Sequence, residues 1–190
     1  MIERLLGRLA GALRRRRIPY MVIGGQAVLY YGSPRLTQDV DVTLGVDTDA
    51  YPAVNLLCRE VGLKALVKRP KDFVQRTHVL PTSDLRSWLR VDFIFSNTSY
   101  ERLAIRRSRQ ARVGHTTVRF VSLEDLIIHK LVAGRPIDVE DARVVMLKSR
   151  GRVDKSYVRH WLKQFEALED VGTKPLAEFE RLCQMNRGTL

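Results

Sequence analysis

Cysteine is scarce in this chain of 190 residues, which contains two, Cys58 and Cys183. Two thiols so far apart in sequence exclude the disulfide-dense scaffolds of small secreted domains, and they favour reduced, buried side chains. Long apolar runs are also lacking, because none approaches the roughly 20 residues that a membrane-spanning helix needs. The first residues show no apolar segment followed by a small-residue cleavage site. We therefore expect a cytoplasmic protein with no signal peptide and no membrane partner.

Acidic residues are outnumbered, with 21 Asp and Glu against 33 Lys and Arg and a formal net charge of +12. This excess favours an anionic partner, and nucleic acid is the first candidate. A basic host proteome is the alternative explanation. The arginines that would supply phosphate contacts are Arg14–Arg17, Arg102, Arg106, Arg107, Arg109 and Arg112. The four histidines are scattered without metal-ligand spacing, which argues against a histidine-based metal site.

Hydrophobic residues make up 45% of the chain, so we expect a packed core in one domain with a small appendage. Apolar spacing predicts helices over residues 2–13, 51–61, 100–109, 122–133, from about 138, 157–168 and 176–185. It predicts strands over residues 20–23, 40–44, 63–67, 73–80, 89–95, 111–113 and 116–121. This order indicates an α/β (α+β) domain over residues 1–150, followed by a C-terminal helical appendage over residues 151–190.

The densest chemical signal lies in residues 20–44. A short apolar strand ends at a Gly24–Gly25 turn, and a helical segment leads to a second strand that carries Asp39 and Asp41. Side chains alternate along a strand with a period of two, so both carboxylates point to the same face. Two adjacent like charges raise the energy of the fold unless a cation lies between them. A divalent metal with oxygen ligands is the simplest such cation.

A third acidic residue interrupts the most apolar strand. Asp92 lies within Leu89–Phe95, where a buried charge without a partner would be costly. Two interpretations remain open: a site residue, which we favour, or a solvent-facing position on one face of a sheet. The glycines Gly24 and Gly25 allow backbone N–H groups to approach phosphates closely. The Walker A loop and the dinucleotide-binding fingerprint do not fit, since no Lys-Ser/Thr pair and no spaced third glycine follow.

This arrangement resembles the signature of the nucleotidyltransferase superfamily related to DNA polymerase β. That signature is an apolar residue, Gly, then Gly or Ser, and further along Asp-x-Asp between apolar residues. Here it reads Ile23-Gly24-Gly25 and then Asp39-Val40-Asp41-Val42. The resemblance implies a polymerase-β-like core, with a mixed, twisted sheet flanked by helices and a small C-terminal helical appendage.

Two more matches extend this resemblance. Asp92 corresponds to the third acidic residue of the superfamily, on a later strand. The approach to the first acid, Arg35-x-Thr37-x-Asp39, looks like the minimal bacterial and archaeal branch. The first match completes the three acids of the superfamily, and the second indicates its minimal branch.

Residues 124–141 are similar to the AbiEii-type toxins of type IV toxin–antitoxin systems. The matching stretch is Glu124–Leu131, then Gly134-Arg135-Pro136 and Asp138-x-x-Asp141. The resemblance implies that Lys130 contacts nucleotide phosphates and that Asp138 or Asp141 is needed for activity. From the residues alone, Lys130 at the edge of a buried helical stripe can equally extend to water. Asp138 can equally be a helix N-cap, with Asp141 in the first turn.

The resemblance also implies a reaction, the transfer of a nucleoside monophosphate from a nucleoside triphosphate to a hydroxyl acceptor. Asp39, Asp41 and Asp92 would hold two Mg²⁺ ions, with Mn²⁺ as an alternative, which activate the attacking hydroxyl and neutralise the leaving pyrophosphate. Asp92 would also help to deprotonate the acceptor. The nucleotide-binding residues would be Gly24, Gly25, Gln26, Arg35, Thr37 and Lys130.

RNA, in particular a tRNA end, is the predicted acceptor because of the basic charge. The resemblance to AbiEii-type toxins further implies a toxin of a toxin–antitoxin system, with an antitoxin as a partner. One alternative is an enzyme of the same fold that modifies a protein or a small molecule such as an aminoglycoside. Another is a non-catalytic antitoxin or binding module, against which the complete set of three acids argues.

Overall fold

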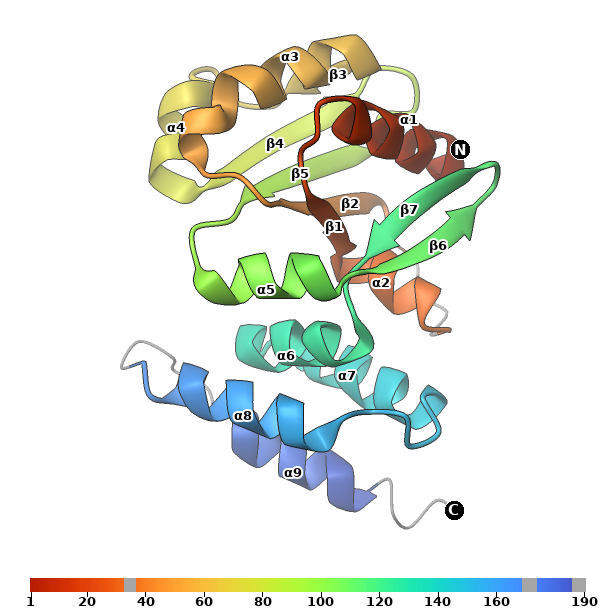
Figure 1. Ribbon diagram of the computed structural model, residues 1–190, viewed down its shortest axis with the longest axis vertical. Coiled ribbons are helices and arrows are strands. Elements are labelled where there is room, and N and C mark those ends of the chain that lie inside the picture. The colour runs from red at the N-terminus through yellow and green to blue at the C-terminus, as the bar shows by residue number, and fades with distance from the viewer. Residues whose placement is uncertain (33–36, 169–173, 186–190) are drawn as a thin grey trace. The chain divides into compact units, whose positions relative to one another are not determined.

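The computed structural model of the protein describes residues 1–32, 37–168 and 174–185 (Figure 1). The chain divides into two compact units. The first consists of Met1–Ala27 and Leu36–Val121, and the second of Val28–Arg35 and Ser122–Leu190. The predicted domain boundary after residue 150 remains a prediction. Within the described ranges, no helix has both the length and the apolar character that crossing a membrane requires.

A seven-stranded mixed sheet forms the centre of the first unit, with the strand order β3-β4-β5-β2-β1-β7-β6 (Figure 1). The strands are β1 (Tyr20–Ile23), β2 (Asp39–Leu44), β3 (Leu63–Ala65), β4 (Val79–Asp84), β5 (Arg90–Phe95), β6 (Arg109–Val113) and β7 (Thr116–Phe120). β1 pairs antiparallel with β2, whereas β2 with β5 and β1 with β7 are parallel pairs. The predicted mixed sheet is thereby confirmed.

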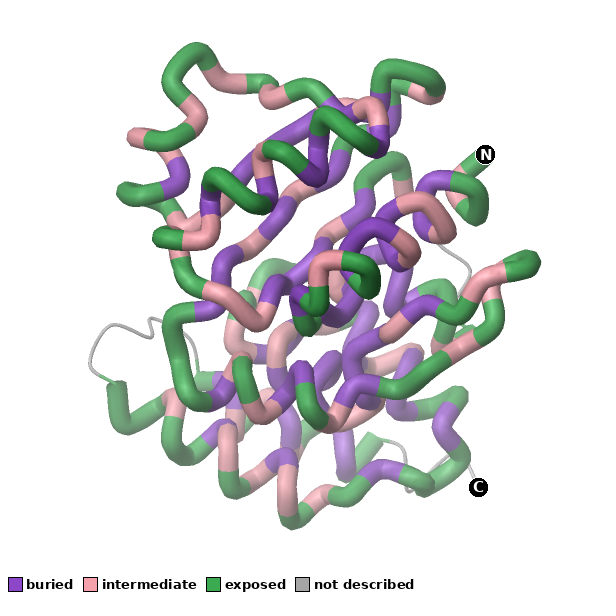
Figure 2. Tube along the Cα trace, turned by 45° about the horizontal axis from the view of Figure 1, so that its top comes forward, coloured by how far each residue is buried: buried purple, intermediate pink, exposed green. Residues whose placement is uncertain are grey.

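Helices accompany this sheet in the same unit, and a 3₁₀ turn (Thr48–Ala50) precedes one of them. They are α1 (Ile2–Arg15), α3 (Tyr51–Val61), α4 (Pro70–Thr77) and α5 (Ser99–Arg107). The short α2 (Gly24–Tyr30) follows β1 directly, and the division between the two units falls within it, after Ala27. α1 packs against β7 and α3, α4 against β4, and α5 against β2. Buried residues are frequent along β1, β2, β4 and β5, whereas the edge strand β6 has none (Figure 2). Fully buried side chains such as Leu5, Met21 and Phe93 each contribute about 1.5–3 kcal/mol to this core.

One prediction in this unit is wrong. We expected a strand over residues 73–80, but α4 covers most of that range and β4 begins at Val79. Pro70 in the first turn of α4 has a backbone already suited to a helix start. His78 ends the helix in the left-handed conformation, with φ 56°, and donates its N–H to the Val74 carbonyl at 2.8 Å. Residue types alternate over this range, but the alternation does not correspond to two faces of a sheet. The segment is helical, and Val74 is its buried residue.

The second unit is helical in its described part. Its helices are α6 (Leu123–Ala133), α7 (Pro136–Lys148), α8 (Lys155–Glu166) and α9 (Pro175–Met185). The Ser122 hydroxyl accepts the Asp125 N–H at 3.1 Å and starts α6, and Gly134, with φ 65°, ends it. α6 packs against α7, α8 and α9. The three helices predicted over 122–133, 157–168 and 176–185 are confirmed, although α7 begins at Pro136 rather than near Asp138.

Candidate functional site

β2 lies between β1 and β5 and carries two of the predicted acidic residues. The parallel register pairs Asp41 with Asp92 on β5. Paired residues of neighbouring strands point to the same face, and so do residues two apart along one strand. Asp39, Asp41 and Asp92 therefore leave one face of the sheet, which we call the acidic face. Asp39 is exposed and the other two are half-buried, so this face is open to solvent.

The glycine turn after β1 lies directly against this face. Gly24 has φ 63°, and a Cβ on it would lie 2.0 Å from Asp41 Oδ2, so no other residue fits without displacing that carboxylate. A Cβ on Gly25 would lie 2.5 Å from Thr37 Oγ1. Both glycines are thus required by close packing. The structure brings the predicted glycine turn into contact with one of the predicted carboxylates, Asp41.

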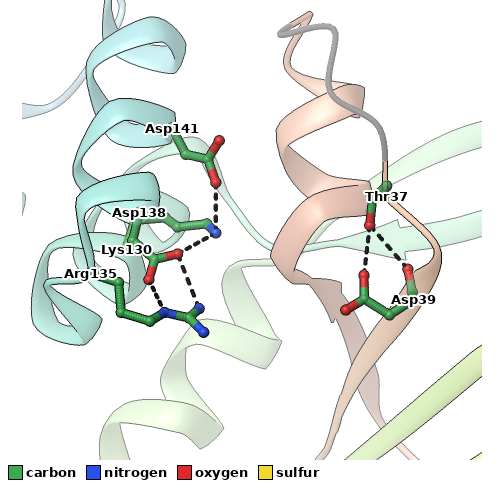
Figure 3. Close-up of polar contacts among 6 residues, drawn as sticks. All are labelled: Thr37, Asp39, Lys130, Arg135, Asp138 and Asp141. Atoms are coloured by element: carbon green, nitrogen blue, oxygen red, sulfur yellow. Dashed lines mark hydrogen bonds and ion pairs between the residues drawn. The ribbon is translucent and has the colours of Figure 1, made fainter.

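Two side-chain hydrogen bonds hold the start of β2. Gln26, buried in α2, donates from Nε2 to the backbone oxygen of Asp39 at 3.1 Å. Thr37 Oγ1 donates to Asp39 Oδ1 at 2.6 Å (Figure 3). Both predicted nucleotide-binding side chains therefore contact Asp39. The remaining candidate of this segment, Arg35, lies outside the described residues.

Sequence reasoning missed a cation on the acidic face, Arg90. Its Nε donates to Asp92 Oδ1 at 2.8 Å and to Oδ2 at 3.0 Å. The hydrogen bond and charge of Asp92, and then the charges of Asp39 and Asp41, raise the pKa of the Arg90 guanidinium above its usual value. The available signal was its position two residues before Asp92, which puts both side chains on one strand face.

The acidic face fits divalent cations in its chemistry. Carboxylate oxygens are the hard ligands that Mg²⁺ and Mn²⁺ prefer. The raised pKa of Arg90 reflects the same attraction of this face for positive charge. Among residues 1–32, 37–168 and 174–185, no three His, Cys, Asp or Glu side chains are gathered closely enough to hold a metal ion. Asp92 is turned toward Arg90 and Asp39 toward Thr37, so an ion shared by both requires these side chains to rotate.

The second unit contains a separate group of charges, which we call the ion-pair cluster: Lys130 on α6, and Arg135, Asp138 and Asp141 at the start of α7 (Figure 3). Lys130 Nζ lies 2.7 Å from Asp138 Oδ1 and 2.9 Å from Asp141 Oδ2. Arg135 donates to the other oxygen of Asp138. Burial raises the pKa of Asp138, but the hydrogen bonds from Arg135 and Lys130 outweigh it and hold that pKa below its usual value.

This geometry decides two questions that the sequence left open. Lys130 is buried and paired, so its ammonium group does not extend to water. Asp138 is not the N-cap of α7, because Arg135 occupies that position. Both aspartates instead face the same lysine. Neither of them is distinguished from the other as an activity-determining residue by these contacts.

The fold has known counterparts among solved structures, although no protein-family model and no curated protein matches the sequence. The antibiotic-resistance factor ANT(2″)-Ia is similar over 88% of this chain and 94% of its own, with a TM-score of 0.62 and 15% identity. An antigenic nucleotidyltransferase-like protein from Paracoccidioides brasiliensis is similar over 85% of this chain and 87% of its own, with a TM-score of 0.57 and 15% identity.

A third counterpart is the lincosamide antibiotic adenylyltransferase LnuA in its lincomycin-bound form. It is similar over 75% of this chain and 96% of its own, with a TM-score of 0.52 and 12% identity. At such identities the likeness shows the fold alone. The chain therefore has a nucleotidyltransferase-like fold, which agrees with the fold class that the family resemblance implied.

Proposed function

We propose that this protein is a Mg²⁺-dependent nucleotidyltransferase, which transfers a nucleoside monophosphate from a nucleoside triphosphate to a hydroxyl acceptor. The observation that carries the proposal is the contact of Asp41 with Gly24, beside Asp92 on the adjacent strand. It joins a turn over which phosphates can approach the backbone with carboxylates suited to divalent cations. The fold that the chain has in common with ANT(2″)-Ia and LnuA supports the same chemistry.

Each carboxylate has its own part in the proposed reaction. Asp39 and Asp41 would hold two Mg²⁺ ions, and Asp92 would share one of them. When bound, such ions activate the attacking hydroxyl and neutralise charge on the leaving pyrophosphate. Asp92 accepts the proton of the acceptor hydroxyl after the Arg90 guanidinium has moved away, since both of its oxygens otherwise accept hydrogen bonds from Arg90.

The nucleotide-binding residues divide by what they contact. Gly24 is half-buried and Gly25 is buried, and neither carries a side chain of its own, which suits a close approach of the triphosphate to the backbone of this turn. Gln26 and Thr37 keep Asp39 in position. The phosphate contacts of Arg35 and Lys130 follow from the family resemblance and remain part of the proposal. For Lys130 this contact means exchanging a carboxylate of the ion-pair cluster for a phosphate oxygen.

We propose RNA, in particular a tRNA end, as the acceptor. The net charge of +12 supports a polyanionic partner, and affinity for RNA should then fall steeply with salt. The similarity of residues 124–141 to AbiEii-type toxins supports a toxin that an antitoxin protein restrains. A small molecule is the second candidate acceptor, because two of the structural counterparts are an antibiotic-resistance factor and an antibiotic adenylyltransferase.

Transfer of label from a nucleotide tests both acceptors in one assay. The protein is incubated with Mg²⁺ and each of the four α-³²P-labelled nucleoside triphosphates, together with total RNA, an aminoglycoside or a lincosamide. We expect label in RNA with a preferred nucleotide, and none without Mg²⁺. Label on an antibiotic but not on RNA would support the second candidate. Absence of transfer to any of the three acceptors would contradict the proposed function.

A further inference from the structure

A cavity of about 630 Å³ lies in the first unit, at the start of β1 and thus at the opposite end of that strand from Gly24. Its walls come from α1, α5, the start of β1 and the β6–β7 hairpin. Four arginines line it: Arg14, Arg17, Arg106 and Arg119. None of the described residues in its lining is acidic. We call this feature the arginine cavity.

Three of these guanidinium groups lack a partner within the described part of the chain. Arg14, Arg17 and Arg106 are exposed and form no ion pair or side-chain hydrogen bond there. Arg119 donates to the Ser108 hydroxyl at 2.9 Å, which is a neutral partner. Like charges that line one cavity repel each other, and an anion bound between them removes this cost.

Other arginines of the protein behave differently. Ion pairs with nearby carboxylates are formed by Arg8, Arg69, Arg90, Arg135, Arg143, Arg159 and Arg181. The described lining of the arginine cavity contains four arginines and no carboxylate that could pair with them. Positive charge is left uncompensated where the walls are concave, which is the condition for binding a multiply charged anion.

The end of α1 positions one of these arginines. Arg17 has φ 55°, a left-handed conformation that favours glycine, in the turn between α1 and β1. Its N–H bonds to the Arg14 carbonyl at 3.0 Å, so the turn is well defined. A side chain at this position costs stability that a glycine would not. Together with the bond from Ile18 N–H to the Leu13 carbonyl at 3.0 Å, this is the usual end of a helix, and it fixes the position of Arg17 at the cavity wall.

We propose that the arginine cavity binds consecutive phosphates of a single-stranded nucleic acid, which, resting on the proposed function, is the RNA acceptor. Guanidinium groups donate two parallel hydrogen bonds to a phosphate, a geometry that lysine does not provide. Exposed arginines continue beyond the cavity on the same helix and hairpin, at Arg102, Arg109 and Arg112. This extent suits a strand with several phosphates better than a single phosphate group.

A second basic cavity in the same unit provides a matched control. It has a volume of about 520 Å³ and includes Arg59, Lys64 and Lys68 in its lining. Removing these three cations changes the net charge as much as removing Arg14, Arg17 and Arg106. A loss of affinity caused by charge alone would appear in both variants, whereas a built phosphate site would affect one.

The test uses fluorescence anisotropy of a fluorescein-labelled single-stranded RNA at several salt concentrations. We expect the Arg14→Gln/Arg17→Gln/Arg106→Gln variant to bind the RNA at least about 10-fold more weakly. The slope of log binding constant against log salt concentration should be smaller in magnitude by about 2, the value for three lost phosphate contacts to a single strand. The Arg59→Gln/Lys64→Gln/Lys68→Gln variant should keep the wild-type slope. Equal losses in the two variants, or no loss in either, would overturn the proposal.

A measurement on the unaltered protein covers the case in which a variant does not fold. Saturating RNA should protect Arg14, Arg17 and Arg106 from modification by phenylglyoxal, as read by mass spectrometry. Full modification of these arginines in the RNA complex would refute the site. Single-stranded DNA of the same sequence should compete, since the contacts are to phosphates. Protection by inorganic polyphosphate without any RNA binding would also overturn the proposal.

RNA binding is measured without a nucleoside triphosphate, so the result of the binding test does not depend on catalysis. If the arginine-cavity variant binds RNA like the wild type while label is transferred to RNA, this inference is wrong and the proposed function stands. If the variant loses RNA binding while the wild-type protein transfers no label, the cavity is a nucleic-acid site and the proposed function is wrong.

Discussion

The acidic face and the ion-pair cluster are built from the same residue types but differ in charge balance and exposure. On the acidic face three carboxylates share the Arg90 guanidinium, and the side chains of Arg90 and Asp92 are 56% and 18% exposed. In the ion-pair cluster two carboxylates share two cations, and the side chains of Lys130 and Asp138 are 8% and 1% exposed.

The difference indicates which cluster stabilises the fold and which is ready to bind a ligand. In the ion-pair cluster Lys130, Asp138 and Asp141 are buried while Arg135 is exposed, and a buried ion pair is costly to disrupt because the remaining charge is left out of contact with water. A solvent-exposed excess of negative charge costs little to maintain and is available to cations from solution. We therefore assign the ion-pair cluster mainly to holding α6 and α7 together, and the acidic face to chemistry.

The largest effect on stability is expected from Lys130→Met, which removes the buried cation that pairs with both Asp138 and Asp141. Breaking a buried pair in this way costs about 3–5 kcal/mol of unfolding free energy. Urea denaturation measures this loss of unfolding free energy. The control is Asp39→Asn on the exposed acidic face, which should change the unfolding free energy by less than about 1 kcal/mol. The double variant Lys130→Met/Asp141→Asn should recover much of the loss. A similar cost for Lys130→Met and Asp39→Asn would remove the distinction between the clusters.

A smaller loss of stability, with a large loss of cation binding, is expected from Gly24→Ala. The added Cβ would meet Asp41 Oδ2 at 2.0 Å in a left-handed conformation, so the carboxylate must move. We expect a cost of about 1–3 kcal/mol from strain. Gly151→Ala is the matched control. Gly151 also has a positive φ, 78°, but a Cβ added to it would have no atom within 4 Å. If both variants retain metal-dependent activity, the close contact of Gly24 with Asp41 is not needed.

The smallest effect concerns pH and Asp138. Its pKa in the folded protein lies below the value of about 3.9 for an unfolded chain. The stability that its ionised form contributes is therefore present above about pH 4 and is lost as the pH falls through the lower, folded pKa. The difference in unfolding free energy between wild type and Asp138→Asn should shrink between neutral pH and pH 3. A difference that stays constant or grows on acidification would contradict the ion-pair assignment. The variant Asp49→Asn, at an exposed position, provides the reference for the effect of removing one carboxylate.

Local patterns in the sequence predicted much of the acidic face. Alternation placed Asp39 and Asp41 together, and the glycine pair marked the turn. The pairing of Asp41 with Asp92 joins strands far apart in the chain, and only the family resemblance indicated it. Arg90 was visible as a neighbour of Asp92 on the same strand face. Its double hydrogen bond depends on side-chain rotation, which alternation does not determine.

The ion-pair cluster was less accessible from sequence. Helical spacing put Lys130 at the edge of a buried stripe, which left its direction open. Its partners Asp138 and Asp141 lie on the next helix, and the meeting depends on how the Gly134–Pro136 turn reverses the chain. The strand predicted over residues 73–80 failed for a related reason. A few residues of alternating type look like a strand when only the sequence is known. The burial of Val74 within a helix is seen only in the structure.

Binding of Mn²⁺ followed by electron paramagnetic resonance tests the central claim most directly, since it reads cation affinity without requiring the acceptor. Wild-type protein with a nucleoside triphosphate should bind Mn²⁺ beyond the amount held by the nucleotide alone. Asp41→Asn should abolish this excess, while Asp49→Asn, which removes the same charge from an exposed position elsewhere, should preserve it. Equal Mn²⁺ binding by wild type and Asp41→Asn would contradict the assignment of the acidic face as a metal site.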